Sequence, residues 1–197
     1  MTKLADIDIP ESWIAGARAG DPDAQARLYA ALAPMIFGLI RRLLGARAVS
    51  EDVFQDTMIT MFEQLARFRG EAPLAAWVRR IAVSKALMYL RSPWRRARLE
   101  PLEPDAFIAD QLAAGLPAAI ATAPLAETLD LERALASLPP TARAVVWLFE
   151  VEGYSHQEIA RAFGRTPSFS KSQLARAHRR LRAWFEPRAE RAPCTPT

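Results

Sequence analysis

Residues Tyr154–Arg182 read YSHQEIARAFGRTPSFSKSQLARAHRRLR, and this stretch predicts two helices joined by a tight turn. Ser155 and Glu158 have the spacing of a capping box, in which each side chain bonds the other residue's backbone N–H at the start of a helix. Gly164 is suited to end that helix, because glycine adopts positive φ without strain. Pro167 then suits the first position of a second helix. Together these signals predict a helix-turn-helix.

The second helix of this stretch has an apolar side and a basic side. The residues expected to face inward at helical spacing are Leu174, Ala177, Leu181 and Trp184. A solvated basic face is the plainer interpretation of the other side, but the preceding helix and turn favour DNA binding. In such a motif the first residues read bases and the later ones grip phosphate. The candidate DNA-contacting residues are Pro167, Ser168, Phe169, Lys171, Ser172, Gln173, Arg176, Arg179 and Arg180.

Charge is distributed unevenly along the chain. The 197 residues carry a net charge of +4 and the pI is ≈ 9.7, which favours a polyanionic partner. Residues 79–98 contain basic side chains and no acid, whereas residues 100–130 contain acids and neither Lys nor Arg. This order predicts two binding surfaces joined by a segment that avoids DNA.

Several protein classes are disfavoured by composition. Cys194 is the only cysteine, so neither an internal disulfide nor a cysteine-based metal site is expected. The first twelve residues lack the apolar centre of a signal peptide, and no uncharged apolar run approaches the length of a membrane span. We therefore expect a cytoplasmic protein without membrane insertion, metal or cofactor.

The hydrophobic periodicity predicts an all-α fold of two small helical domains joined by a flexible linker. We call residues 21–98 the first module and residues 124–186 the second module. Residues 1–20 form an N-terminal extension, residues 99–123 an acidic linker that has room for a short helix at 107–116, and residues 187–197 a tail expected to be disordered.

Helix boundaries follow from capping and breaking residues. The first module is expected to have helices from Pro22 to Gly45, from an N-cap at Ser50 to about Phe68, and from Leu74 to Arg91. Pro34 is expected to kink or split the first of these. In the second module, a helix with Leu131, Ala134, Leu135 and Leu138 on its inner face precedes a break at Pro139–Pro140. A buried helix is expected to follow over 141–152.

Two helical modules in this order resemble the bacterial RNA polymerase sigma factors of the extracytoplasmic-function (ECF) type, over roughly Ala24–Phe185. Residues 50–82, SEDVFQDTMITMFEQLARFRGEAPLAAWVRRIA, look like the family's region 2. Residues 138–182, LPPTARAVVWLFEVEGYSHQEIARAFGRTPSFSKSQLARAHRRLR, are similar to its region 4. The resemblance implies that region 2 docks on the polymerase β′ clamp and captures the melted −10 element. It implies that region 4 binds the β flap and reads the −35 element of promoter DNA as duplex.

The residues of the first module suit both of its implied tasks. An acidic helix side suits a basic protein partner, although ordinary solvated polarity is the other interpretation. The candidate polymerase-binding residues are Glu51, Asp52, Gln55, Asp56 and Glu63. Unpaired DNA is held by aromatic stacking and positive charge. The candidate −10-binding residues are Phe68, Arg69, Arg79, Arg80, Ser84, Lys85, Met88, Tyr89, Arg91 and Arg95. Trp77 is expected in the core, and Phe68 has a second interpretation as the end of a buried stripe.

Some positions depart from the family's pattern. Ser84 and Met88 stand where asparagine and aspartate are usual, so the hydrogen bonds made there change or are lost. Ser170 falls on the inward side of its helix, where an apolar residue is expected, and Phe169 turning inward is the expected compensation. Gln173 replaces a frequent arginine; since glutamine favours adenine and arginine favours guanine, this predicts an altered −35 preference.

Two other function classes were weighed against this interpretation. Clustered Glu51, Asp52 and Asp56 resemble a metal-binding nuclease site with His156 as a base, but no second catalytic partner accompanies them, so no catalytic residue is assigned. A conventional helix-turn-helix regulator would bind duplex DNA without core RNA polymerase and usually dimerise; the acidic helix side and the basic residues of 79–98 favour a sigma factor over it. A binding-only adaptor or an anti-sigma-like protein would leave those basic residues unexplained. The resemblance also allows an anti-sigma factor as a partner. The sequence does not identify that partner, the inducing signal, the promoter or the oligomeric state.

Overall fold

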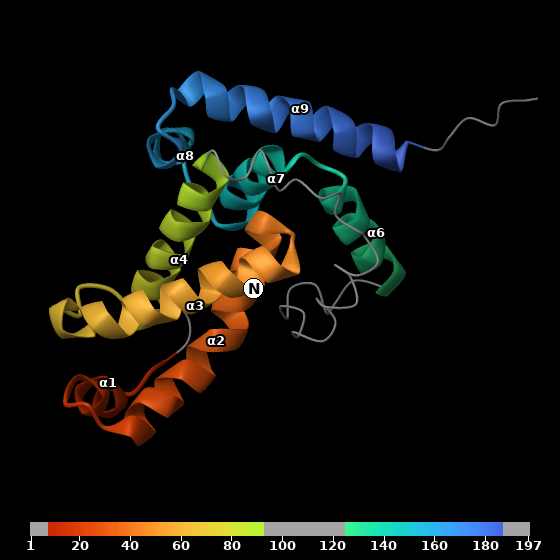
Figure 1. Ribbon diagram of the computed structural model, residues 1–197. Coiled ribbons are helices and arrows are strands. Elements are labelled where there is room, and N and C mark those ends of the chain that lie inside the picture. The colour runs from red at the N-terminus through yellow and green to blue at the C-terminus, as the bar shows by residue number, and fades with distance from the viewer. Residues whose placement is uncertain (1–7, 93–124, 187–197) are drawn as a thin grey trace, which may run out of the picture.

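The structure, a computed structural model, describes residues 8–92 and 125–186, with side chains described from residue 130 in the second stretch. Figure 1 shows helices throughout both stretches, and they contain no strand. The all-α prediction is therefore confirmed. The linker with its short helix at 107–116, Arg95 and the tail with Cys194 lie outside the described residues.

The N-terminal extension contains α1 (Glu11–Arg18), which packs against α2 (Pro22–Leu44), the first helix of the first module. The carboxylate of Asp21 caps α2 by accepting a hydrogen bond from the backbone N–H of Asp23 at 3.0 Å. Gly45 ends the helix with a φ of 85°, as its position after the last apolar residue predicts. The helix continues through Pro34, so the prediction that this residue splits it is wrong.

The next helix, α3 (Arg47–Gln64), starts earlier than the sequence suggests. Ser50 is not its N-cap: Ser50 is fully buried within the helix, and its hydroxyl donates to the carbonyl of Ala46 at 2.8 Å. This back-bonding is the usual fate of a serine inside a helix. A short 3₁₀ turn, η2 (Leu65–Arg67), follows, and after the loop at 68–73 comes α4 (Leu74–Arg91).

The second module consists of α6 (Leu125–Ala136), α7 (Pro140–Val146), a π-helical turn η4 (Trp147–Val151), α8 (His156–Phe163) and α9 (Pro167–Phe185). The break at 139–140 is confirmed, with Pro140 in the first turn of α7. Two residues predicted to face inward are exposed instead, namely Leu131 at 42% and Trp184 at 47%. Each lies on a part of its helix, α6 or α9, that is not fully covered by another described element.

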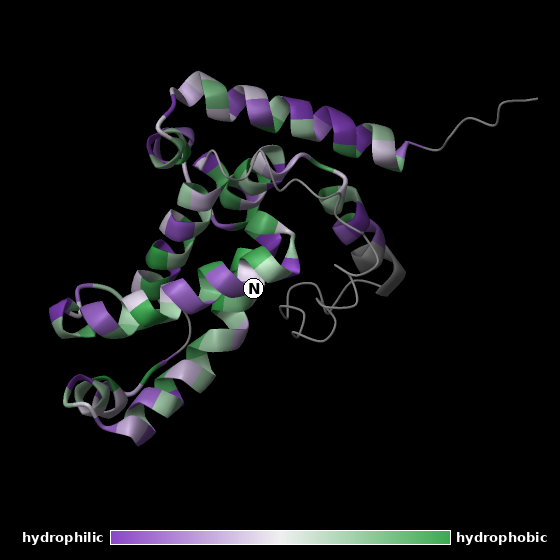
Figure 2. Cartoon of the chain, viewed as in Figure 1, coloured by the Kyte–Doolittle hydropathy of each residue, from purple (hydrophilic) through white to green (hydrophobic). Residues whose placement is uncertain are grey.

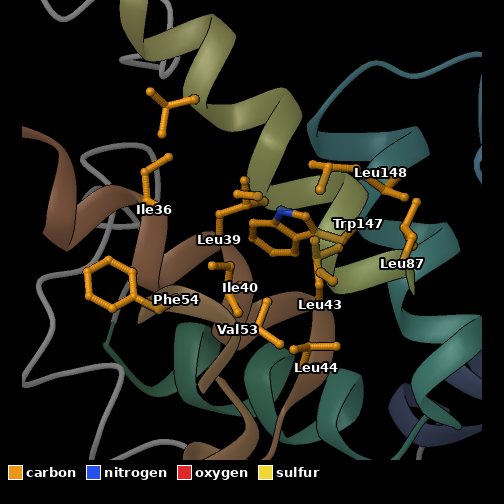
Figure 3. Close-up of a cluster of buried hydrophobic side chains, with 14 of the residues drawn as sticks. Ile36, Leu39, Ile40, Leu43, Leu44, Val53, Phe54, Leu87, Trp147 and Leu148 are labelled. Atoms are coloured by element: carbon orange, nitrogen blue, oxygen red, sulfur yellow. The ribbon is translucent and has the colours of Figure 1, made fainter. Parts of the chain in front are cut away.

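The two modules share one hydrophobic core. Figure 3 shows Trp147 and Leu148 of the second module among Ile36, Leu39 and Leu43 of α2. Trp147 is only 8% exposed, and burying a large side chain of this kind contributes about 1.5–3 kcal/mol. In Figure 2 the apolar faces of α2, α4 and α7 turn toward one another, whereas α9 is largely polar along its outer side. The modules therefore pack together through α2 with α7 and α4 with α8.

Candidate nucleic-acid interface

The helix-turn-helix is fixed by the local signals that its sequence carries. Ser155 accepts from the backbone N–H of Glu158 at 3.2 Å, and the Glu158 carboxylate accepts from the backbone N–H of Ser155 at 2.8 Å. The Ser155 hydroxyl also donates to the Glu158 carboxylate at 2.7 Å; this hydrogen bond and the one from the Ser155 backbone N–H lower the pKa of the Glu158 carboxyl, because they favour its ionised form. Gly164 ends α8 in the left-handed region with φ 62°. The capping box and the glycine turn are both confirmed.

A polar contact replaces the apolar one expected between α8 and α9. Ser170 is fully buried, and its hydroxyl lies 3.0 Å from Nδ1 of His156. The imidazole in turn stacks on Phe149, with ring centroids 4.4 Å apart and planes 14° from parallel. Phe169 is half-buried with its ring 5.5 Å from that of Phe163, so the predicted inward turn of Phe169 is what the structure shows. His156, considered above only as a base, thus contacts the buried side of α9.

The outer side of α9 presents most of the predicted −35 residues to solvent. Gln173 and Phe169 are half-buried; the exposed residues are Pro167, Ser168, Lys171, Ser172, Arg176, Arg179 and Arg180. At the start of the helix lies a pocket of about 690 Å³, lined by residues that include Arg165, Ser168 and Arg176. Arg165 is exposed beside the predicted set and was missed. Its place in the turn, next to Gly164, was the signal for it.

The acidic side of α3 is largely accessible. Asp52, Gln55, Asp56 and Glu63 are exposed, and Glu51 is half-buried with an ion pair to Arg47 at 2.8 Å. Asp56 also forms an ion pair with Lys85 of α4, at 2.6 Å. The structure thus joins a predicted polymerase-binding residue to a predicted −10-binding residue through one ion pair.

The predicted −10 residues of α4 fall into two groups. Arg80, Ser84, Met88 and Arg91 are exposed, and Lys85 and Tyr89 are half-buried. Arg79 instead faces the second module, where it forms an ion pair with the carboxylate of Glu152 and donates to the Glu152 carbonyl at 2.8 Å. Its guanidinium also lies 5.3 Å from the centroid of the Tyr154 ring. Burial raises the pKa of the Tyr154 hydroxyl, and the positive charge of Arg79 opposes that shift.

The loop between α3 and α4 gives a different arrangement from the one expected for base stacking. Phe68 is 9% exposed, and its ring packs against Trp77 with centroids 5.3 Å apart. The structure therefore shows Phe68 as the end of a buried stripe, because the Trp77 ring covers one face and Arg18 lies over the ring at 5.8 Å. Arg69 is exposed and lies 3.8 Å from Glu71.

Charged side chains are buried where the modules meet. Arg143 is 1% exposed and donates to the carbonyl of Leu44 at 2.7 Å, while the Arg42 guanidinium lies 5.1 Å from the ring centroid of Trp147. Burial lowers the pKa of Arg42, against the opposing charges of Glu132 and Glu152. Burial likewise raises the pKa of Glu132, although Arg42 and Arg143 favour its ionised form. No sequence pattern pointed to this cluster.

Neither 8–92 nor 125–186 contains a group of three or more His, Cys, Asp or Glu side chains placed to hold a metal ion. Within the same two stretches, no helix combines the length and apolar character that crossing a membrane requires.

Comparisons with known proteins match both modules to the same protein family. The family model described as sigma-70 region 2 matches residues 28–96, and that described as sigma-70 region 4 matches residues 128–181. The chain is 31% identical over 163 residues to the ECF RNA polymerase sigma factor SigM of Mycobacterium tuberculosis, covering 83% of this chain and 78% of that protein. It is 29% identical over 167 residues to the RNA polymerase sigma factor CarQ of Myxococcus xanthus, covering 84% and 91%.

A solved structure also resembles the fold. The sigma factor RpoE from Bartonella quintana, crystallised with the anti-sigma factor NepR, aligns with a TM-score of 0.50 and 21% identity. The alignment covers 81% of this chain and 94% of that one. At this identity the likeness bears on the fold alone.

Proposed function

This chain belongs to the ECF group of the sigma-70 family and is a sigma factor for transcription initiation by RNA polymerase, and we propose how its two modules divide that task. The second module reads the −35 element as duplex DNA through α9. The first module captures the unpaired −10 element along α4 and the 68–73 loop. The acidic side of α3 binds core RNA polymerase.

The observation that carries the −35 assignment is the exposed outer side of α9. A helix in the major groove places its first turns against base edges and its later turns beside phosphates. Lys171 and Gln173 lie in the first two turns, whereas Arg176, Arg179 and Arg180 follow at the spacing of phosphate contacts. The pocket at the turn leaves the start of α9 accessible to a groove edge.

Charge separation supports the assignment for the first module. The exposed positions of α4 carry Arg80 and Arg91 together with Met88, and positive charge beside apolar surface suits unpaired DNA. The exposed acids of α3 repel DNA and suit a basic protein surface, for which we propose the β′ clamp. The β flap is the proposed contact of the second module. We include an anti-sigma factor among the proposed partners because membership of the ECF group allows one.

The proposal is tested by in vitro transcription with purified core polymerase and a pool of genomic promoter fragments, followed by sequencing of the transcripts. Specific initiation that depends on this protein, from sites sharing two separated elements, is the expected result. The matched pair is Arg176→Gln, on the outer side of α9, and Arg27→Gln, which is exposed on α2 and belongs to none of the three proposed surfaces. Only the first is expected to reduce initiation.

A different outcome would favour the alternative of a conventional regulator. If the protein binds duplex sites tightly by itself and core polymerase initiates nowhere in its presence, the division of labour proposed above is wrong.

A further inference from the structure

The N-terminal helix α1 lies before the part of the chain that the region 2 family model matches, residues 28–96. It is nevertheless part of the first module's core. Ile14 and Ala17 are 4% and 5% exposed, and the amide of Gln25 donates to the carbonyl of Ala17 at 3.4 Å. A Cβ at Gly16 would lie 2.9 Å from the Cβ of Ala24, so α1 and α2 approach closely at this glycine. The helix is therefore held firmly in place.

Arg18, in the last turn of α1, reaches the far end of α3. Its Nε donates to the carbonyl of Leu65 at 3.2 Å, and its Nη2 donates to the carbonyl of Phe68. The guanidinium also lies over the Phe68 ring, and Glu11 lies 3.8 Å from it on α1 itself. One side chain thus contacts both ends of the turn at which the chain leaves the helix.

The carbonyls of Leu65 and Phe68 lie where the chain turns out of the helix, so a hydrogen-bond donor there affects the course of the backbone. The Leu65 carbonyl accepts the backbone N–H of Phe68 at 3.1 Å as well as Nε of Arg18, and the Phe68 carbonyl lies just beyond η2, which ends at residue 67. Phe68 is extended, with ψ 119°, and starts the loop that leads to α4. A planar guanidinium presents its N–H groups in a fixed fork, so a pair of donors at this turn fixes the direction in which the loop departs.

The loop and the N-terminal segment together enclose a space. A pocket of about 520 Å³ is lined on one side by Asp8, Ile9, Glu11 and Ile14, and on the other by Phe68 and residues 70–74. Arg69, the exposed cation of the loop, follows directly after the carbonyl that Arg18 holds. The position of this cation therefore depends on a residue of α1.

We propose that Arg18 is a positioning residue for recognition of the −10 element. It does not touch DNA; it sets the departure of the 68–73 loop, and through it the placement of Arg69 against the unpaired strand. This inference rests on the proposed function of the first module. It assigns to the N-terminal helix a part in promoter selectivity.

The test uses holoenzyme and a promoter recovered by the transcription experiment. The variants are Arg18→Met, which keeps the aliphatic stem, Arg18→Lys, which keeps one donor group, and Arg27→Met as an exposed control. Binding is measured on a fork-junction probe with a single-stranded −10 element and on a duplex probe with the −35 element alone. The fork-junction measurement is repeated with one substituted −10 base.

Arg18→Met is expected to weaken fork-junction binding about tenfold, close to 1.4 kcal/mol, and to reduce discrimination against the substituted base. Duplex −35 binding and affinity for core polymerase are expected to stay at the wild-type value. Arg18→Lys should retain part of the discrimination against the substituted base, and Arg27→Met should discriminate as well as the wild type. A purely structural role for Arg18 would not change the ratio of binding to the wild-type and substituted −10 probes, so partial recovery of that ratio by lysine indicates positioning.

Three results would overturn the inference. One is a wild-type discrimination ratio in Arg18→Met. Another is an equal loss on the −10 and −35 probes, which would mean general unfolding; thermal melting of each variant identifies that case. If the wild-type holoenzyme itself ignores the −10 substitution, the proposed function of the first module fails as well.

Discussion

The buried Arg143 makes a specific prediction about how the two modules are held together. Its side chain is 1% exposed, and the hydrogen bond to the Leu44 carbonyl, at 2.7 Å, runs from the second module to the end of α2. Arg143→Met keeps most of the volume and removes the charge. The Leu44 carbonyl then loses a donor, and Glu132, 3% exposed, loses one of the two cations that face it.

The expected cost is large because these groups are already desolvated. Removing one partner from a buried charged network typically costs about 3–5 kcal/mol, since it leaves the remaining charge uncompensated. The Arg42 guanidinium still faces Glu132, so we expect the lower part of that range, about 3 kcal/mol. Replacing both Arg143 and Glu132 by methionine should recover much of the loss, because no carboxylate is then left without its partner.

The assay is urea unfolding followed in parallel by tryptophan fluorescence, to which Trp147 contributes, and by far-UV circular dichroism. Because the wild-type core is shared, both signals should report one transition. In Arg143→Met the midpoint should fall, and the fluorescence change should precede the loss of helix as the modules separate. Arg133→Met is the control: this arginine on α6 is 44% exposed and pairs with Asp130 at the surface, where such pairs contribute about 0–1 kcal/mol. A loss in Arg143→Met no larger than in this control would refute the reasoning.

Three further predictions concern single sites. Burial raises the pKa of Glu132 above its ordinary value of 4.5, so the folded state binds this proton more tightly; the contribution of this group to stability is fully present below pH 4.5 and is lost as pH rises through the folded pKa. Glu132→Gln should therefore flatten that part of the stability–pH curve in urea unfolding. Ser170→Val and His156→Leu should each cost about 1–2 kcal/mol by orphaning a buried polar group, whereas the double variant should cost less than their sum; strict additivity would show no coupling. Arg176→Ala should weaken all −35 duplexes about equally, while Gln173→Arg should reorder preference among them, and equal effects in a competition binding assay would contradict this.

Local signals predicted the helix-turn-helix well because its determinants are neighbours in sequence. Ser155, Glu158 and Gly164 act within a few residues of one another, and each does in the structure what its type and spacing favour. Ser50 shows the limit of the same argument. A serine before an acidic stretch suits an N-cap, but α3 starts at Arg47, since tertiary packing buries Ser50 inside the helix.

The site residues that were missed depend on contacts between distant parts of the chain. Arg18 meets Phe68, and Arg143 meets Leu44, across separations that no periodicity records. Ser170 is an intermediate case. Its place on the inward side of the helix predicted that the Ser170 hydroxyl is buried. A buried hydroxyl requires a hydrogen-bond partner. Only the fold identifies His156 as that partner.

Under the proposed function, Arg79 links the docking of the modules to binding of the −10 element. Its guanidinium pairs with Glu152, and it cannot hold that carboxylate and a −10 phosphate at the same time. Glu152→Gln removes the charge while its amide oxygen can still accept from Nε1 of Trp147, as the carboxylate does at 3.1 Å. A partly buried pair that contributes about 1–1.5 kcal/mol would hold Arg79 back from DNA by roughly five- to tenfold.

The free Glu152→Gln protein is therefore expected to bind a single-stranded −10 oligonucleotide about five- to tenfold more tightly than the wild type. Fluorescence anisotropy at fixed ionic strength measures this directly. Glu150→Gln is the matched control, because Glu150 lies in η4, two residues before Glu152 at the end of that turn, and pairs with His178 of α9 instead of with the first module. Each variant removes one negative charge, so a general gain in attraction for DNA would appear in both. Equal affinities for the two variants would mean that Arg79 does not exchange Glu152 for DNA, whereas a gain confined to Glu152→Gln would show that module docking and −10 binding compete for one arginine.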